Sequence, residues 1–263
     1  MEQQYQQDFS SLPPAPPPRK RSGVITVVLV LVLALAVAVI LNESLLRIRW
    51  VSVNGNHLIT WEETVRAAGL DKPVGYFTVS ESKIAAGIES NRYLIFVRME
   101  KNFPNSITIY VKERVPVARV QEMSSDYFLD GEGMVLERGA LRENSGNKDD
   151  MVVVTGLKPK ELRVGRMMTA GTAEHMQAYR ALFEELEQQG FLSQISELNI
   201  SDPESIYLVT RDGYSAHLGG IDSLRAKIGT VRAVIAKLRE MGKTGGMLEA
   251  NIPGEAIYTP PSP

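Results

Sequence analysis

Apolar residues are distributed along the chain in several patterns, and each pattern predicts a different kind of element. The longest is an uninterrupted run of eighteen residues from Val24 to Leu41, in which only Thr26 is not apolar. Eighteen residues rise about 27 Å in an α-helix, which is close to the hydrocarbon thickness of a bilayer. The run therefore predicts one membrane-spanning helix, which we expect over residues 23–42.

The residues on either side of this run indicate how the chain crosses the membrane. Arg19, Lys20 and Arg21 precede it, and positive charge beside a span favours the cytoplasmic side. Arg47 and Arg49 follow it, but they open a long domain, and long domains cross membranes largely regardless of charge. The N-terminus is therefore expected in the cytoplasm and the rest of the chain outside it.

The segment before the run lacks the pattern of a folded element. Residues 1–22 are rich in Gln, Ser and Pro, so we expect a disordered cytoplasmic tail. A cleaved signal peptide is the alternative, because small residues within the run resemble cleavage sites. The run is longer than the usual apolar core of a signal peptide, and about twenty residues precede it, which favours an uncleaved anchor.

Residues 46–114 combine short alternating patterns with two short helical ones. Thr60 and Glu63 have the spacing of a capping box, and Gly69 follows at a position that closes a helix. Strict alternation of apolar and polar residues near the end of the segment predicts a half-buried strand. A β-α-α-β-β module is therefore expected. Its elements are a strand at Arg49–Val53, helices that begin at Thr60 and Ser80, and strands at Tyr93–Lys101 and Ser106–Glu113.

The remainder of the chain predicts a second module that mixes strands with two amphipathic helices. Apolar residues recur at helical spacing over Thr172–Gln189 and Ser223–Met241, and Gly139–Asp150 is a charged loop. The fold class is therefore α+β, with a mixed, mainly antiparallel sheet over residues 115–259 and a disordered tail at 260–263. Strands are expected at Val117–Glu122, Tyr127–Leu129, Met134–Leu136, Ile195–Ile200, Ile206–Thr210, Tyr214–Leu218, Met247–Ile252 and Glu255–Tyr258.

Composition and charge narrow the chemistry that the chain can perform. Its 263 residues carry a net charge of −2 without a conspicuous basic patch, which argues against nucleic acid as a partner. Cysteine is absent, which excludes disulfides, thiolate catalysis and cysteine metal sites. His57, His175 and His217 are far apart in sequence and have no neighbour at a ligand spacing. We therefore expect no metal, no cofactor and no small-molecule substrate.

Three short motifs raise the alternative of a membrane-anchored, penicillin-binding type of serine enzyme. They are S-x-x-K at Ser80–Lys83, S-x-N at Ser145–Asn147 and K-T-G at Lys243–Gly245. That chemistry needs the serine at the start of a helix in a large helical subdomain, with the K-T-G on a strand beside it. Here the motifs coincide with a helix start in a small module, a charged loop and a helix stop. These structural roles explain all three, and no catalytic residue is expected.

The order of the elements and several stretches of sequence resemble one known family. A single anchor, a β-α-α-β-β module and a mixed sheet with two helices follow one another in the FtsQ/DivIB family of bacterial cell-division proteins. By this resemblance, residues 46–114 are a POTRA domain and residues 115–259 an FtsQ-type β domain. The stretches that carry it are Val51–Asn56, Phe103–Ala118 with the junction Glu113-Arg114-Val115-Pro116-Val117-Ala118, Tyr127–Gly133 and Asp212–Gly219.

The resemblance implies a non-catalytic, bitopic scaffold of the bacterial division machinery. Such a protein lies in the bacterial cytoplasmic (inner) membrane, with its C-terminal domains in the periplasm or extracytoplasmic space. There it binds FtsB/FtsL-type bitopic division proteins, while residues 24–41 contact the lipid bilayer. The chain departs from the family at Asn251, where a basic residue is expected, and this argues against a partner salt bridge at that position.

The last predicted strand suggests a mechanism of binding. A strand at the edge of a sheet presents unpaired N–H and C=O groups and can accept a strand from a partner. A short proline-rich segment follows this strand, so we expect it to be an edge, which Pro260 and Pro261 either leave open or shield. The residues expected to bind the partner are Ile252, Gly254, Glu255, Ala256, Ile257 and Tyr258.

Overall fold

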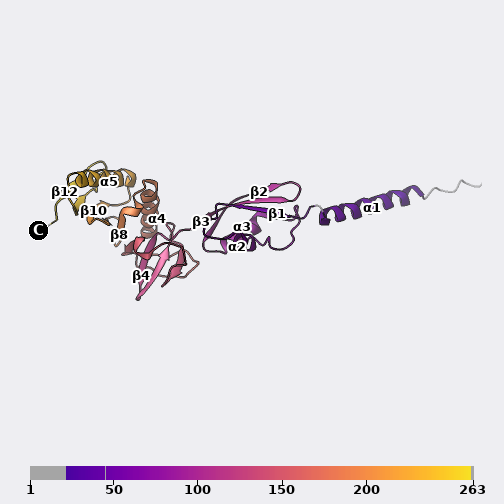
Figure 1. Cartoon of the computed structure of the whole chain (residues 1–263), viewed down its shortest axis with the longest axis horizontal. Helices are drawn as coiled ribbons and strands as arrows, with labels where there is room; N and C mark the ends of the chain where they lie inside the picture. The colour runs from indigo at the N-terminus through magenta and orange to yellow at the C-terminus, as the bar shows by residue number, and fades with distance from the viewer. Residues whose placement is uncertain (1–21, 45, 262–263) are drawn as a thin grey trace, which may run out of the picture.

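The computed structural model describes residues 22–44 and 46–261 and contains one long helix followed by two sheet-bearing modules (Figure 1). The long helix, α1 (Ser22–Ser44), includes an 18-residue window, Gly23–Ile40, with a mean hydropathy of 3.2. None of that window is buried in the protein, and α1 lies at the opposite end of the molecule from the C-terminus. The helix is therefore long and apolar enough to cross a bilayer, as its sequence predicts.

The first module, residues 46–114, has the β-α-α-β-β order that its sequence predicts. Its sheet has the order β1-β3-β2, with β1 parallel and β2 antiparallel to β3. Ile107, Ile109 and Val111 alternate along β3 and are buried in one core with Ile84 and Ile88 of α3. The bounds are β1 (Trp50–Asn54), α2 (Trp61–Ala67), α3 (Glu81–Glu89), β2 (Leu94–Asn102) and β3 (Ser106–Glu113).

The starts of the two short helices differ in their capping. The Thr60 hydroxyl accepts from the Glu63 N–H at 3.2 Å, and the Glu63 carboxylate accepts from the Thr60 N–H at 3.4 Å, so the predicted capping box is present. Ser80 occupies the N-cap position of α3, but its hydroxyl contacts the Ser82 hydroxyl at 2.8 Å and caps no backbone N–H. The predicted helix start is therefore confirmed there, and the Ser80 side chain does not cap the helix.

The second module, residues 115–261, is built on one nine-stranded sheet with the order β12-β11-β10-β9-β8-β7-β4-β5-β6. Five of the pairs in this sheet are antiparallel and three are parallel, so it is mixed and mainly antiparallel as expected. Its strands are β4 (Ala118–Glu122), β5 (Ser125–Leu129), β6 (Val135–Arg138), β7 (Val152–Thr155), β8 (Ile195–Asn199), β9 (Ile206–Thr210), β10 (Tyr214–Gly219), β11 (Gly246–Glu249) and β12 (Ile257–Thr259).

Two long helices make the crossovers that parallel strand pairs require. α4 (Ala173–Gln188) lies between β7 and β8, and α5 (Leu224–Glu240) lies between β10 and β11; both of these strand pairs are parallel. Each helix buries the apolar face that its periodicity predicts, including Tyr179 and Leu182 on α4 and Ile228 and Val231 on α5. These faces and the sheet form the main core of the module.

Two parts of the sheet differ from the sequence-based expectation. β7 was not predicted, although it joins the two halves of the sheet by pairing with β4 and β8. The final strands are shorter than expected, because β11 ends at Glu249 and β12 begins only at Ile257. Of the residues expected to bind a partner through a terminal strand, Ile252, Gly254, Glu255 and Ala256 therefore lie in the turn before β12. The Glu255 N–H donates to the Ile252 carbonyl at 3.1 Å and closes this turn.

Residues immediately after β3 tie the two modules together. The Arg114 guanidinium donates to the Asp130 carboxylate, and to that of Glu132 at 2.8 Å. Asp130 is only 5% exposed, and its carboxylate also accepts from the Met134 N–H at 2.7 Å. Glu113, just before Arg114, serves the first module instead: its carboxylate accepts three backbone N–H groups, from His57, Leu58 and Ile59.

A second contact between the modules comes from β6. Leu136 is fully buried, and it belongs to the core of the first module. The next residue, Glu137, accepts from the Tyr93 hydroxyl at 2.5 Å and from Arg92 at 3.0 Å. Burial, together with the hydrogen bond to Glu137, raises the pKa of Tyr93 to about 12. The modules therefore share packed and hydrogen-bonded contacts in addition to their covalent link.

Candidate functional site

The candidate site is the edge of the large sheet that β12 forms. β12 pairs with β11 in antiparallel register, Met247 with Thr259, Leu248 with Tyr258 and Glu249 with Ile257. Within the part of the chain that the structure describes, no strand pairs with the other side of β12. Backbone groups on that side are therefore available to a strand from another chain.

The side chains of the edge divide between an exposed and a supporting set. Ile257 is 70% exposed and Ile252, in the preceding turn, is 54% exposed. Tyr258 and Ala256 are half-buried and pack against the core of the second module. The Tyr258 hydroxyl donates to the Gly245 carbonyl at 3.1 Å. A partner strand beside β12 would therefore contact the exposed Ile257 side chain. Tyr258 instead packs inward and stabilises the edge strand.

A glycine at the start of β11, Gly246, allows β12 to approach closely. Gly245 and Gly246 have φ angles of +66° and +109°, a region that favours glycine. A Cβ at Gly246 would lie 2.6 Å from the Tyr258 ring and 2.7 Å from the Thr259 carbonyl oxygen. The edge strand thus depends on a residue without a side chain at this position.

Lys243 links the β12 edge to β10. Its carbonyl accepts from the Tyr214 hydroxyl at 2.5 Å, and its ammonium group lies 5.3 Å from the centre of the Tyr258 ring. Burial, followed by the nearby Asp212 carboxylate, raises the pKa of the Tyr214 hydroxyl. Lys243 and Gly245, two residues of the K-T-G motif, therefore position the sheet edge. Sequence reasoning missed this role and treated them only as a helix stop, although the glycine pair Gly245-Gly246 was a visible signal of a close approach.

An ion pair fastens α5 to the turn between β9 and β10. Arg239 donates to Asp212 at 2.7 Å and to the Gln194 side chain at 2.8 Å. Burial raises the pKa of Asp212, but hydrogen bonds from Arg239 and Thr210 more than offset this, and the pKa is lowered overall. The helix end that precedes β11 is thereby held against the strands that support it.

A hydrogen-bonded row crosses β9, β10 and β11 near the same edge. The His217 ring contacts the Ser205 hydroxyl at 3.1 Å through Nε2 and the Glu249 carboxylate at 2.8 Å through Nδ1. Tyr207 stacks on the same ring, with 4.5 Å between ring centres. The row has the residue types of a serine-hydrolase triad, and its hydrogen bonds link the loop before β9 to β11.

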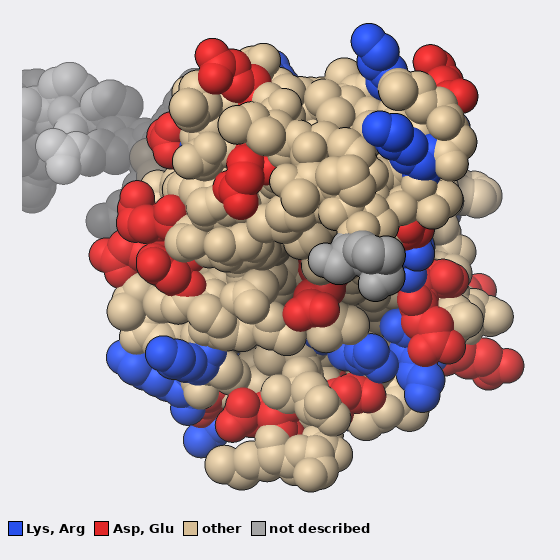
Figure 2. All heavy atoms as spheres, turned by 90° about the vertical axis from the view of Figure 1, so that its left-hand side faces the viewer, with Lys and Arg blue, Asp and Glu red and all other residues tan. Residues whose placement is uncertain are grey.

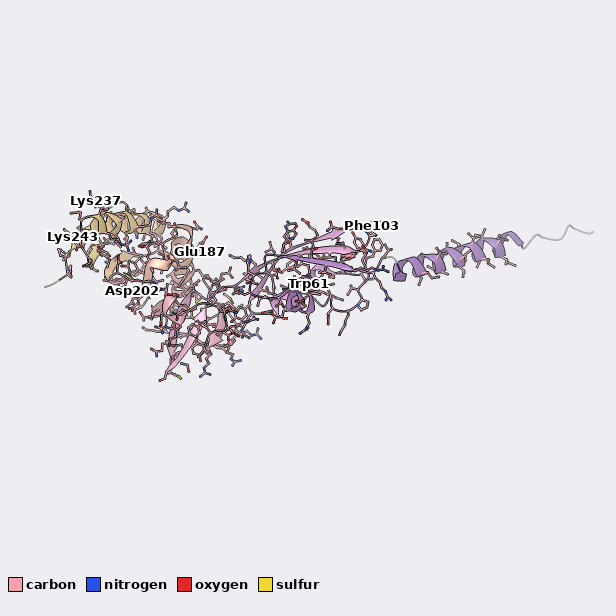
Figure 3. All side chains as sticks on the ribbon, in the orientation of Figure 1. Trp61, Phe103, Glu187, Asp202, Lys237 and Lys243 are labelled. Carbon is pink, nitrogen blue, oxygen red and sulfur yellow. The ribbon has the colours of Figure 1, made fainter. Side chains whose placement is uncertain are left out.

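The three motifs of the enzyme alternative lie on separate elements. Ser80 begins α3 in the first module, Ser145 is buried in the loop before β7, and Lys243 follows α5. Among the hydrogen bonds and ion pairs of the described residues, none links one motif to another. Figure 3 shows Lys243 at the far end of the second module, well away from the first. The arrangement that such an enzyme needs is not formed.

The predicted membrane flank, Arg19, Lys20 and Arg21, lies outside the described residues. At the opposite end, the face around the C-terminus has a broad uncharged area, with acidic side chains within it and further Lys, Arg, Asp and Glu residues around it (Figure 2). Exposed apolar residues at this end include Met241, Ile252 and Ile257. Exposed apolar side chains bordered by charged ones are common on surfaces that bind protein.

Two family profiles match consecutive parts of the chain. Residues 46–114 match the profile described as "POTRA domain, FtsQ-type", and residues 118–250 match "Cell division protein FtsQ/DivIB, C-terminal". Their limits correspond to the first module and to most of the second.

Individual relatives have the same names. The chain is 22% identical over 211 residues to "Cell division protein DivIB" of Clostridium tetani, covering 80% of this chain and 78% of that protein. It is 25% identical over 195 residues to "Cell division protein FtsQ" of Syntrophotalea carbinolica, covering 73% and 66% respectively. The solved major extracytoplasmic domain of DivIB from Geobacillus stearothermophilus is 17% identical and aligns with a TM-score of 0.30, over 49% of this chain and 97% of that one.

Proposed function

The chain belongs to the FtsQ/DivIB family of cell-division proteins, and from this premise we propose that it is a non-catalytic, single-pass scaffold of the bacterial divisome. It binds other membrane-anchored division proteins of the FtsB/FtsL type outside the cytoplasmic membrane and so helps to assemble the septum machinery. Its POTRA domain covers residues 46–114 and its β domain residues 115–259.

The observation that carries this proposal is the open edge of β12. A partner segment in extended conformation adds to this edge as a further strand and forms backbone hydrogen bonds with it. Ile257 gives the partner an exposed apolar contact, and Tyr258 and Gly246 keep the edge in place. Backbone pairing supplies most of the affinity in this mode, while side chains supply specificity.

Partner capture tests the proposal in the full chain, purified in detergent. Ile257→Pro removes a backbone donor and distorts the edge strand, so binding of FtsB/FtsL-type proteins should be lost. Ile257→Ser keeps the backbone and should weaken binding by roughly 1–3 kcal/mol, which is about 5- to 150-fold in Kd.

Met123→Ser is the matched control, because Met123 is 91% exposed in the turn between β4 and β5, at the other end of the sheet. It should bind normally, and thermal unfolding should show that all three variants are folded. Full affinity in a folded Ile257→Pro variant would exclude strand addition at β12.

The proposed topology places the N-terminus in the cytoplasm and the C-terminal modules in the periplasm or extracytoplasmic space. The apolar helix α1 and the basic residues Arg19, Lys20 and Arg21 support this orientation. A reporter enzyme that is active only outside the cytoplasm, fused after Pro263, should be active. An inactive fusion in a stably expressed chain would reverse the topology and exclude an extracytoplasmic partner site.

A further inference from the structure

The first module has a group of aromatic side chains at one end that the proposed function does not use. Phe77, Phe103 and Trp50 are 67%, 72% and 70% exposed. The half-buried Tyr76 ring lies 5.4 Å from the Phe77 ring and 5.8 Å from the Phe103 ring, edge to face in both cases. These four residues, here named the aromatic tip, lie in the loop before α3, in the β2–β3 turn and at the start of β1.

Hydrogen bonds hold the aromatic tip beside the chain that leaves α1. The Tyr76 N–H donates to the Leu46 carbonyl at 2.6 Å, and the Ile48 N–H donates to the Val74 carbonyl at 2.9 Å. The β2–β3 turn is attached as well, because the Trp50 N–H donates to the Asn105 carbonyl at 3.3 Å. Both aromatic loops are therefore fixed at the level of residues 46–50.

That level lies next to the membrane surface. The apolar run ends at Leu41, Asn42–Ser44 extend α1 by about 4.5 Å, and the next two residues span at most about 7 Å, so Leu46 lies at most about 12 Å above the hydrocarbon. The polar headgroup layer on each side of a bilayer is about 5–7 Å thick and takes up roughly half of this distance. Figure 3 shows Phe103 at the end of the first module that adjoins α1. When α1 spans the bilayer, the aromatic tip is thus held within reach of the headgroup layer.

The residue types suit that environment. Trp and Tyr are enriched at membrane interfaces, where an apolar ring is partly buried and its polar atom stays hydrated. Two exposed phenylalanines in water would instead leave a large apolar surface unburied. We propose that the aromatic tip inserts into the headgroup layer of the same membrane that α1 crosses, and gives the first module a second attachment to the lipid.

The second attachment has a mechanical consequence. A single helix followed by a short connection leaves a domain free to tilt, whereas contact at the tip restricts the tilt of the first module relative to the membrane. Arg114, Asp130 and Leu136 join the two modules. A fixed tilt of the first module therefore also fixes the height of the β12 edge above the bilayer.

Site-directed spin labelling tests the proposal directly, because the full chain has no cysteine to remove. Labels at Phe77→Cys and Phe103→Cys would be measured in lipid nanodiscs that each hold one chain. Leu33→Cys, within α1, is the control for the hydrocarbon, and Met123→Cys, 91% exposed on the second module, is the control for water. We expect the ratio of oxygen collisions to collisions with a water-soluble nickel chelate to be higher at the tip labels than at Met123→Cys and lower than at Leu33→Cys.

Two other outcomes of the spin-label measurement would overturn the proposal. Tip labels that behave like Met123→Cys, while Leu33→Cys reports lipid, would overturn the proposal and leave the membrane anchor intact. In nanodiscs that each hold two chains, dipolar broadening between the labels of the two chains would indicate that a second copy covers the tip, and would overturn the proposal too. Each spin label replaces one of the phenylalanines under test. A second measurement is therefore needed in which both phenylalanines are present.

That measurement uses the fluorescence of Trp50 in the Trp61→Phe variant, since the chain contains only two tryptophans. Brominated lipids should quench Trp50, and the double variant Phe77→Ser, Phe103→Ser should reduce the quenching. Equal quenching with and without the two phenylalanines would show that they do not hold the tip in the membrane.

Discussion

The guanidinium of Arg114, the first residue after β3, donates to the buried carboxylate of Asp130 in the turn after β5. The two side chains are 12% and 7% exposed, and the Asp130 backbone carbonyl also accepts from the buried Tyr179 hydroxyl at 2.7 Å. The ion pair thus joins the end of the first module to a turn of the second, and the Tyr179 hydrogen bond attaches α4 to the same turn. The arginine of the Glu113-Arg114 junction therefore fixes the position of one module against the other.

Arg114→Ala should destabilise the chain strongly, because it leaves the Asp130 carboxylate buried without its cation. Breaking a buried pair in this way typically costs about 3–5 kcal/mol. Urea unfolding of the full chain in detergent measures the effect. The matched control is Arg163→Ala, since Arg163 pairs with Glu161 on the surface and should change stability by less than about 1 kcal/mol. Equal effects of the two substitutions would contradict a structural role for the buried pair.

The two short helices of the first module allow a comparison of their caps. Thr60→Ala removes the hydroxyl of a complete capping box and should cost about 0.5–2 kcal/mol in the free energy of unfolding. Ser80→Ala removes a hydroxyl that caps nothing and should change stability by no more than about 0.5 kcal/mol. Thermal unfolding of both variants distinguishes these values. A larger loss for Ser80→Ala would mean that its hydroxyl caps α3 in solution.

Much of the fold could be predicted because its signals are local. The alternation of Ile107, Ile109 and Val111 in β3 and the helical spacing of Leu182 and Leu186 in α4 each identify one buried face. β7 has no comparable signal, since Val152–Thr155 is a short apolar run without clear alternation. Its place in the sheet depends on parallel pairing with two distant strands, which a single segment does not encode.

The candidate site was only partly predictable for the same reason. A terminal edge strand followed from the apolar residues Ile257 and Tyr258 near the end of the sequence. Its register did not, because the pairing of Leu248 with Tyr258 and the contact of Gly246 with that ring exist only in the folded sheet. The residues before Ile257 were therefore assigned to a strand although they form its turn.

The ion pair beneath the edge predicts a dependence of stability on pH. The pKa of Asp212 is lower in the folded chain than its ordinary value of 3.8, so folding favours the carboxylate. This contribution is present above a pH of about 4 and is lost as the pH falls through the lower, folded pKa. The difference in unfolding free energy between the unmodified chain and Asp212→Asn should therefore shrink as the pH is lowered below 4.

Urea unfolding at several pH values measures this difference. Arg239→Gln provides the control, because without the Arg239 guanidinium the effect of Asp212→Asn should be smaller and less dependent on pH. An unchanged pH dependence in that background would mean that another group stabilises the Asp212 carboxylate.

Covalent labelling tests the non-catalytic assignment. A fluorescent penicillin should form no stoichiometric adduct at Ser80 or Ser145, because Ser80 lies in the first module and Lys243 at the far end of the second. A fluorophosphonate should likewise leave Ser205 unmodified, although His217 contacts its hydroxyl at 3.1 Å. Mass spectrometry of the full chain detects either adduct. An adduct at Ser205 that disappears in His217→Gln would show that the row is a working nucleophile and base.

Two glycines with positive φ test whether the position of β12 determines partner capture. Gly246→Ala introduces a Cβ that would lie 2.7 Å from the Thr259 carbonyl oxygen, so β12 must move away from β11. In Gly242→Ala, φ is +70° and nothing lies within 4 Å of the new Cβ. Both variants bear strain from a positive φ, which is +70° at Gly242 and +109° at Gly246, so thermal unfolding must first show that both are folded. Binding of FtsB/FtsL-type proteins should weaken at least about tenfold, or 1.4 kcal/mol, more in Gly246→Ala than in Gly242→Ala. If the two folded variants bind equally well, the partner does not bind at the β12 edge, and its site must be sought elsewhere on the two modules.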